Sequence, residues 1–207
     1  TGIDTFTGTL TQMQAFQTNK DAGDIQTKLV YDATLLDDGT LDAADLNALL
    51  GAGKILGSVG MTAATQVTGT ESELDTFLTV NVANGKFSPS SSLTIDVSDT
   101  TPVTSVSAAK LNTYDLYVTG AGSVTASQAT TITGSVSDIP TALTASGISV
   151  ASDIDASFDV ITTATDQNVI DINSVIANTT GTVTGTVTGT PQRMADITLS
   201  TASGGDA

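Results

Sequence analysis

Short hydrophobic stretches recur along the chain in two forms. One alternates polar and apolar residues and closes with Val67-Thr68-Gly69-Thr70 or with Ile132-Thr133-Gly134-Ser135. A period of two is typical of a half-buried strand. The other form places apolar residues three and four positions apart, as in Leu46, Leu49 and Leu50, and predicts one face of a short helix. Helices of about two to three turns are unstable alone and need neighbouring elements to cover them.

Each predicted helix is preceded by residues that can cap its first turn. Asp42 and Ser107 stand directly before two segments of the form Ala-Ala-x-Leu-Asn and are expected N-caps. The helices that follow the Thr-Gly pattern are predicted to begin at three hydroxyl residues: Thr11, Ser72 and Ser137. Gln14 lies three residues after Thr11, so this pair predicts a capping box.

A further strand signal is an apolar stretch that closes with Asp. It occurs at residues 29–32, 93–96 and 157–159. Together with the Thr-Gly pattern it predicts pairs of one strand and one helix that alternate along the chain.

Most of these elements belong to an internal repeat. Residues 41–47 align with residues 106–112, which lie 65 positions later, and the same offset places 67–69 on 132–134 without a gap. Partial copies of the pattern occur near both ends of the sequence, at residues 7–16 and 187–194. The repeat predicts a partial unit over 1–40, full units over 41–105 and 106–170, and a partial unit over 171–207.

The repeat and its element order predict the fold class. Short strands that alternate with short helices favour an α/β repeat, stacked as a right-handed, solenoid-like coil. An all-β sandwich is the alternative, because the Thr/Val alternation over 179–188 is a strand pattern. The recurring helix caps favour the α/β repeat.

The composition excludes several kinds of chemistry. The 207 residues include no Cys, His or Trp, which excludes disulfides, thiol nucleophiles, Ser-His-Asp triads and His-based metal sites. The formal net charge of -16 disfavours binding to nucleic acids, because their phosphate backbones repel a negatively charged protein. No apolar run reaches the roughly 18 residues of a transmembrane helix. With two Glu, three Tyr and no Trp, a carbohydrate-cleaving site is not expected either, and the chain is predicted not to be an enzyme.

Residues 106–113, 122–139 and 141–148 carry a likeness to a known class of proteins. They resemble the Thr/Ala-rich repeats of very large secreted proteins of marine bacteria and cyanobacteria, often called haemolysin-type or RTX-like. The resemblance implies export by a type I route and a role at the cell surface or in a matrix, and it implies no catalytic residues. The tandem Gly-Gly-x-Gly-x-Asp calcium signature of RTX proteins does not occur here; Gly204-Gly205-Asp206 is the nearest match.

Two acidic groups are candidate calcium ligands. If Gly39 is the turn glycine of an EF-hand-like loop, Asp38, Asp42 and Asp45 occupy its positions 5, 9 and 12. The residues at positions 1 and 3 of that loop are Thr34 and Leu36, which supply few oxygens. The alternative interpretation is an Asp N-cap inside a solvated acidic turn.

The second acidic group consists of Asp153, Asp155 and Asp159. Asp153 and Asp155 are expected on one face of a strand, with Asp159 across a turn. Calcium between neighbouring units is the functional hypothesis for this group. Surface charge with a capping role is the alternative.

These observations predict a non-enzymatic extracellular structural protein. The chain begins and ends inside a repeat unit, so unfinished strand edges are expected to associate head to tail with copies of the same chain, as in a surface layer, filament or adhesin stalk. The alternatives are a calcium-binding module of a large secreted adhesin and a virion fibre or decoration protein. Cell-surface glycans are a further candidate partner.

Overall fold

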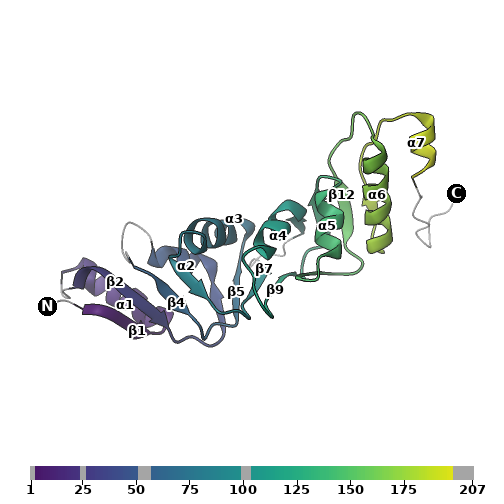
Figure 1. Cartoon of the computed structure of the whole chain (residues 1–207). Helices are drawn as coiled ribbons and strands as arrows, with labels where there is room; N and C mark the ends of the chain where they lie inside the picture. The colour runs from purple at the N-terminus through teal and green to yellow at the C-terminus, as the bar shows by residue number, and fades with distance from the viewer. Residues whose placement is uncertain (1–2, 24–26, 51–56, 99–103, 198–207) are drawn as a thin grey trace. The chain divides into compact units, whose positions relative to one another are not determined.

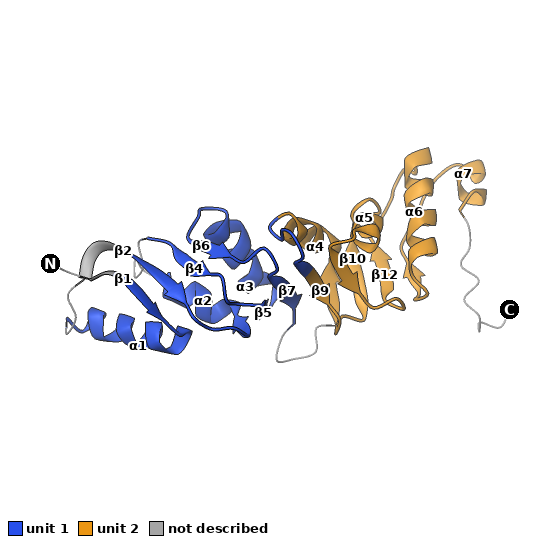
Figure 2. Cartoon of the chain, turned by 60° about the horizontal axis from the view of Figure 1, so that its bottom comes forward, with its two compact units in different colours: residues 1–99, 117–123 blue, residues 100–116, 124–207 orange. Residues whose placement is uncertain are grey.

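A computed structural model describes residues 3–23, 27–50, 57–98 and 104–197 (Figure 1). Contacts divide the chain into two compact units, shown in two colours in Figure 2. Unit 1 comprises residues 1–99 and 117–123, and unit 2 comprises residues 100–116 and 124–207. Both units alternate parallel strands with helices. The predicted α/β class is therefore confirmed, and the all-β sandwich is wrong.

Unit 1 contains two sets of parallel strands. The first sheet has the order β1 (Ile3–Gly8), β2 (Thr27–Leu35), β4 (Val59–Met61) and β6 (Phe87–Pro89). The second set has the order β3 (Thr40–Asp42), β5 (Gln66–Gly69) and β7 (Thr94–Val97). The helices are α1 (Leu10–Asp21), α2 (Ala43–Leu49) and α3 (Glu71–Asp75), which continues into the π-helical segment η2 (Thr76–Val82).

Unit 2 repeats this construction. Its four-stranded parallel sheet has the order β8 (Ser105–Ser107), β10 (Thr131–Gly134), β12 (Asp155–Phe158) and β13 (Val183–Thr184). Residues 124–126 of β9 (Ser123–Ala126) pair with β11 (Ile148–Val150). The helices are α4 (Ala108–Asp115), α5 (Asp138–Thr144), α6 (Asp166–Asn178) and α7 (Pro191–Ala195).

Most strands pair with the strand two places further along the chain, at a nearly constant spacing in the sequence. Leu41 of β3 pairs with Val67 of β5, which pairs in turn with Ile95 of β7. In unit 2 Ile132 of β10 pairs with Ala156 of β12. The segment between two such partners typically contains a strand, a turn, a second strand and a helix, and we call this segment a module.

Most modules therefore have two strands where the sequence predicted one, whereas the modules that begin with β1 and β12 have one. Of the two strands that precede α3, β4 has three residues and β5 has four. In three residues an alternating pattern has too few positions to stand out from the surrounding sequence. The long Thr/Val alternation over 179–188 forms little regular strand: it contributes β13 and a bridge between Val187 and Ile161.

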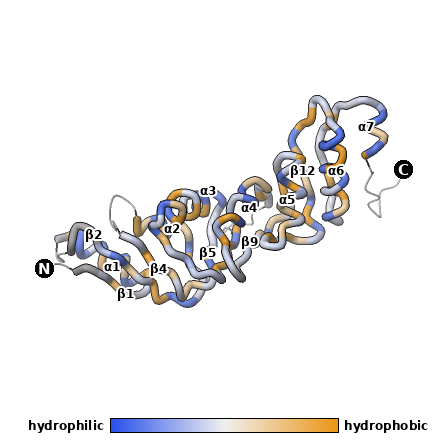
Figure 3. The backbone as a smooth tube through the Cα atoms, viewed as in Figure 1, coloured by the Kyte–Doolittle hydropathy of each residue, from blue (hydrophilic) through white to orange (hydrophobic). Residues whose placement is uncertain are grey.

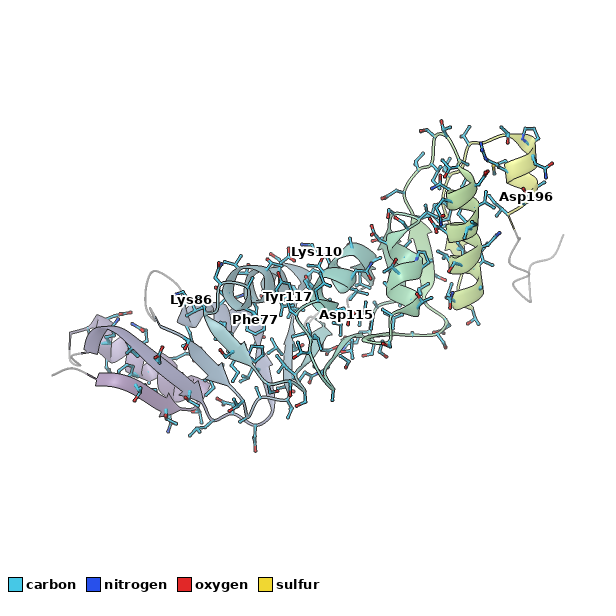
Figure 4. The ribbon with its side chains drawn as sticks, in the orientation of Figure 1. Phe77, Lys86, Lys110, Asp115, Tyr117 and Asp196 are labelled. Carbon is cyan, nitrogen blue, oxygen red and sulfur yellow. The ribbon has the colours of Figure 1, made fainter. Side chains whose placement is uncertain are left out.

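The repeated apolar positions form the core of each unit. Three pairs of residues at the 65-residue offset are completely buried: Leu46 and Leu111, Val67 and Ile132, Leu74 and Ile139. Full burial of one such side chain contributes about 1.5–3 kcal/mol. Phe77, labelled in Figure 4, packs on Phe87 with 5.2 Å between ring centroids and ties η2 to β6. The two aligned copies thus bury the same positions, while the boundaries of the units stay predictions.

The helix caps agree with the sequence at two helices. Asp42 caps α2, where its Oδ1 accepts hydrogen bonds from the backbone N–H of Ala44 at 2.7 Å and of Asp45 at 3.3 Å. Ser107 caps α4 by accepting from the N–H of Lys110.

Of the other three predicted helix starts, two are shifted and one, at Ser137, is confirmed. Thr9 and Thr70 cap α1 and α3, so the predicted starts at Thr11 and Ser72 lie two residues too late. Thr9 has extended backbone angles and follows β1 directly, because the strand runs into the helix without a loop. Its capping box uses Gln12 instead of Gln14, with the Gln12 Oε1 accepting from the Thr9 N–H at 2.9 Å. Ser137 is the N-cap of α5 and makes no side-chain cap bond within the described chain.

Hydrophobic residues occur in short stretches along both units (Figure 3). In the described ranges, no helix has the length and apolar character needed to cross a bilayer.

Candidate functional site

The first predicted acidic group lies around the start of α2. The Asp42 carboxylate caps the helix, and the Asp45 Oδ1 accepts a hydrogen bond from the Gln14 Nε2 at 3.2 Å. Asp38 lies in the segment between β2 and β3, where its backbone carbonyl accepts from the Thr65 Oγ1 at 3.5 Å. Two of the three carboxylates therefore accept hydrogen bonds from backbone or side-chain donors of the protein.

The second predicted acidic group surrounds β12. The Asp155 Oδ1 accepts from the backbone N–H of Thr182 at 2.7 Å, which joins β12 to the segment that leads into β13. Asp153 precedes the strand and Asp159 follows it, and all three side chains are exposed.

Neither group is brought together as a set of metal ligands. Across the ranges that the structure describes, no three carboxylates lie close enough to hold one ion. A calcium site at Asp38, Asp42 and Asp45, or at Asp153, Asp155 and Asp159, stays a prediction.

The features that do recur in space are contacts between successive modules. The first is the approach of a glycine to an alanine. A Cβ added to Gly69 would lie 2.9 Å from the Ala43 Cβ, and one added to Gly134 would lie 3.4 Å from the Ala108 Cβ. These two contacts are related by the 65-residue offset. A third occurs at the end of unit 2, where a Cβ on Gly189 would lie 3.0 Å from that of Ala164.

The burial of the three alanines explains this close approach. Ala43 and Ala108 are completely buried, and Ala164 is 1% exposed. Their methyl groups fill the space above the glycines, so the backbones of adjacent modules meet closely. The sequence showed the recurring Thr-Gly pattern, but its partner lies in the preceding module and was not identified from the sequence.

The second recurring contact is an asparagine that bridges two helices. The Asn47 Nδ2 donates to the carbonyl of Glu73 at 2.9 Å, and the Asn112 Nδ2 donates to the carbonyl of Asp138 at 3.0 Å. A third bridge joins Asn173 to the carbonyl of Asp196 at 3.0 Å. Asn47 and Asn112 bind the backbone of the helix one module later, and Asn173 binds the backbone of the C-cap residue of α7. The signal in the sequence was the Leu-Asn pair that both aligned copies share.

The two aligned asparagines differ at their oxygens. The Asn47 Oδ1 accepts from the Asn81 Nδ2 at 2.8 Å. The Asn112 Oδ1 is inaccessible to solvent and has no hydrogen-bond partner among the described residues. The residue at the offset position of Asn81 is Ser146, which is exposed. The first copy therefore completes a polar network that the second copy leaves open.

The third recurring contact joins an aspartate to the backbone that follows a glycine. The Asp32 Oδ1 accepts from the Ser58 N–H at 2.8 Å, as Asp155 does from Thr182. Glycines precede both donors. A Cβ on Gly57 would lie 2.5 Å from the Tyr31 carbonyl oxygen, so only glycine permits this approach. These carboxylates hold the edges of neighbouring modules together.

A chain of hydrogen bonds that begins at the buried residues Tyr31 and Gln17 closes the first module. The Tyr31 hydroxyl donates to the Gln17 Oε1 at 2.9 Å, and the Gln17 Nε2 donates to the Asp21 Oδ1 at 2.6 Å. Burial, and then the negative charge of Asp21, raise the pKa of Tyr31 above its usual value. The Lys20 ammonium lies 5.8 Å from the centroid of the Tyr31 ring. This arrangement holds the tyrosine neutral and fixes α1 against β2.

The chain matches no protein-family model, no curated protein and no solved structure.

Proposed function

We propose that this chain is a non-enzymatic extracellular structural protein, a segment of a surface layer, filament or adhesin stalk. In this proposal the modules stack as a solenoid, each covering the apolar side of the next. One observation supports this proposal. The Gly, Ala and Asn residues that both aligned copies share make contacts between modules.

The positions that change between copies support the same conclusion. Asp42 and Asp45 in the first copy correspond to Ser107 and Lys110 in the second. A repeated binding site keeps its ligands in each copy, whereas this repeat keeps the stacking contacts and exchanges the charges. Stability of such an array grows with each interface between neighbours, which suits a scaffold that extends.

The charge favours an exposed location. The chain has 22 acidic residues against six basic ones, and the core of the described residues is formed almost entirely by apolar side chains. A strongly negative surface keeps an extended protein soluble and discourages non-specific association. The chain contains no Cys, so it has no thiol to oxidise outside the cell.

Immunogold electron microscopy on unpermeabilised source cells and their medium tests this function. Antibody raised against the full chain is expected to label fibres, layers or stalks outside the cells. Label confined to the cell interior, or to virus particles, would overturn the proposal.

A thermal melt separates the structural role from a calcium-binding module. The structural proposal expects the same melting temperature in millimolar calcium and in excess chelator. An increase of several degrees in calcium would favour the calcium-binding module instead.

A further inference from the structure

One glycine of the recurring Thr-Gly pattern has a different neighbour. Gly8 aligns with Gly69, and each stands directly before the threonine of a capping box, Thr9 or Thr70. At Gly69 the nearest atom to an added Cβ on another element belongs to Ala43 of the preceding module. At Gly8 the neighbouring atoms belong to the same module. An added Cβ would lie 2.9 Å from the Phe6 Cε1 and 2.8 Å from the Gln12 Oε1.

We propose that Phe6 is a plug that closes the β1 side of unit 1 against another module. Its ring stands over Gly8 where a preceding module would place the methyl group of its alanine. A module that docks on β1 in the register seen elsewhere in the chain must first displace this ring. The inference rests on contacts inside unit 1 and, separately, inside unit 2, and it does not depend on the extracellular role.

The identity of the side chain explains the difference. Phe6 occupies the position of Val67 in the alignment, and both residues lie two positions before the glycine. Val67 is completely buried between strands on both sides. A valine side chain is too short and too rigid to lean along the strand, whereas a phenylalanine ring reaches the glycine two residues away.

Two further contacts hold the ring in place. Its centroid lies 4.5 Å from that of Phe16 on α1, and Phe16 in turn packs edge-on against Tyr31.

Among the described strands, β1 pairs with β2 alone and has one free edge. Unprotected edges of this kind recruit other strands, and covering an edge is one means of protecting it.

The repeat also indicates which kind of module the Phe6 ring keeps from docking on β1. In three places a module with alanine precedes a module with glycine: Ala43 before Gly69, Ala108 before Gly134 and Ala164 before Gly189. Gly8 lies in a module of the glycine kind. The partner that would fit it is therefore a module of the alanine kind, with a strand, a cap residue and Ala-Ala-x-Leu-Asn, as in residues 105–112.

The test adds such a module to the full chain. Residues 104–130 are inserted in place of residues 1–4, directly before Thr5, so that the added Ala108 stands as far before Gly8 in the sequence as it naturally stands before Gly134. The added segment contains a single trypsin site, Lys110, whose counterpart in the natural position is labelled in Figure 4. Cleavage at the added Lys110 removes the added segment 104–110 from the N-terminus and is followed by intact mass.

We compare this chimera with the same chimera carrying Phe6→Ile, which restores the residue found at Ile132. With Phe6 present, the added module is expected to stay undocked and to be cut rapidly. With Phe6→Ile, it is expected to dock and to be cut at least about tenfold more slowly, because proteolysis follows the population of the open form. Adding Ala108→Leu in the inserted module of the Phe6→Ile chimera is the matched control, and it should restore rapid cutting.

Equal cutting rates in the two chimeras overturn the plug. If both are protected, the ring yields to a docking module. If both are cut rapidly, the ring does not decide docking. Far-ultraviolet circular dichroism of each chimera verifies that the rest of the chain has folded.

Discussion

Gly69 lies so close to Ala43 that a Cβ on the glycine would stand 2.9 Å from the alanine Cβ. The two residues are distant in the sequence and belong to consecutive modules. The backbone angles of Gly69 are open to other residues, so the neighbouring methyl group is what requires glycine there. At Gly134 the backbone is the reason instead, because its φ is 148° while an added Cβ would stand at an ordinary contact distance of 3.4 Å from the Ala108 Cβ. Because Gly69 has no side chain, the two modules can pack at this short distance.

The Gly69→Ala substitution tests this contact. The added methyl group is expected to lower the free energy of unfolding by about 1–3 kcal/mol, the usual cost of overpacking a tight interface. Ala43→Gly in the same chain should recover part of the loss by making room. Urea denaturation of the wild type, both single variants and the double variant gives the coupling energy, and purely additive effects would contradict a direct contact.

Thr9→Ala and Thr11→Ala form a matched pair at the start of α1. Thr9 accepts from the Gln12 N–H, so its loss is expected to cost about 1 kcal/mol. Thr11 is exposed inside the helix, and its replacement should change stability by less than about 0.5 kcal/mol. Denaturant unfolding with hydrogen exchange of the α1 amides measures both. A larger loss at Thr11 would return the helix start to its predicted position.

Asn47→Ala and Asn112→Ala compare the complete and the open polar network. Removing Asn47 leaves both the Glu73 carbonyl and the Asn81 Nδ2 without their partner, and is expected to cost about 2–3 kcal/mol. Removing Asn112 breaks one bond but also removes an unsatisfied oxygen, so a cost below about 1 kcal/mol is expected. Thermal and urea unfolding distinguish these values, and equal costs would refute the difference between the copies.

Tyr31 predicts how stability depends on alkaline pH. Its pKa in the folded protein is raised by burial and by Asp21, so folding favours the neutral phenol. The resulting stability is fully present below the pKa of an unfolded tyrosine, about 10, and is lost as the pH rises through the folded-state pKa.

Urea unfolding of the wild type and of Tyr31→Phe between neutral pH and about pH 11 measures this effect. At neutral pH the wild type is expected to be more stable by about 1 kcal/mol, because Phe leaves the buried Gln17 Oε1 without its donor. Above about pH 10 the wild type should lose stability more steeply than the variant. Parallel pH profiles for the two proteins would show that Tyr31 does not carry the linkage.

The elements with strong local signals were predicted correctly. Asp42 and Ser107 cap their helices because an N-cap depends on a side chain reaching amides two or three residues away. Leu46 and Leu49, which helix periodicity placed on one apolar face, are buried because that periodicity marks the covered side of the helix. The start of α1 was placed at Thr11, since a second Thr–Gln pair at Thr9 and Gln12 has the same spacing and only the end of β1 selects between them.

The sequence by itself determined which residues repeat, which positions are apolar and that strands alternate with helices, because these depend on periods of a few residues and on the 65-residue offset. Only the tertiary structure decided what the repeated Gly, Ala and Asn residues do. Their partners lie in the neighbouring module, and pairing over that distance depends on how strands come into register. The same is true of Phe6, whose ring covers Gly8 for a reason that becomes visible only when Gly69 is seen against Ala43.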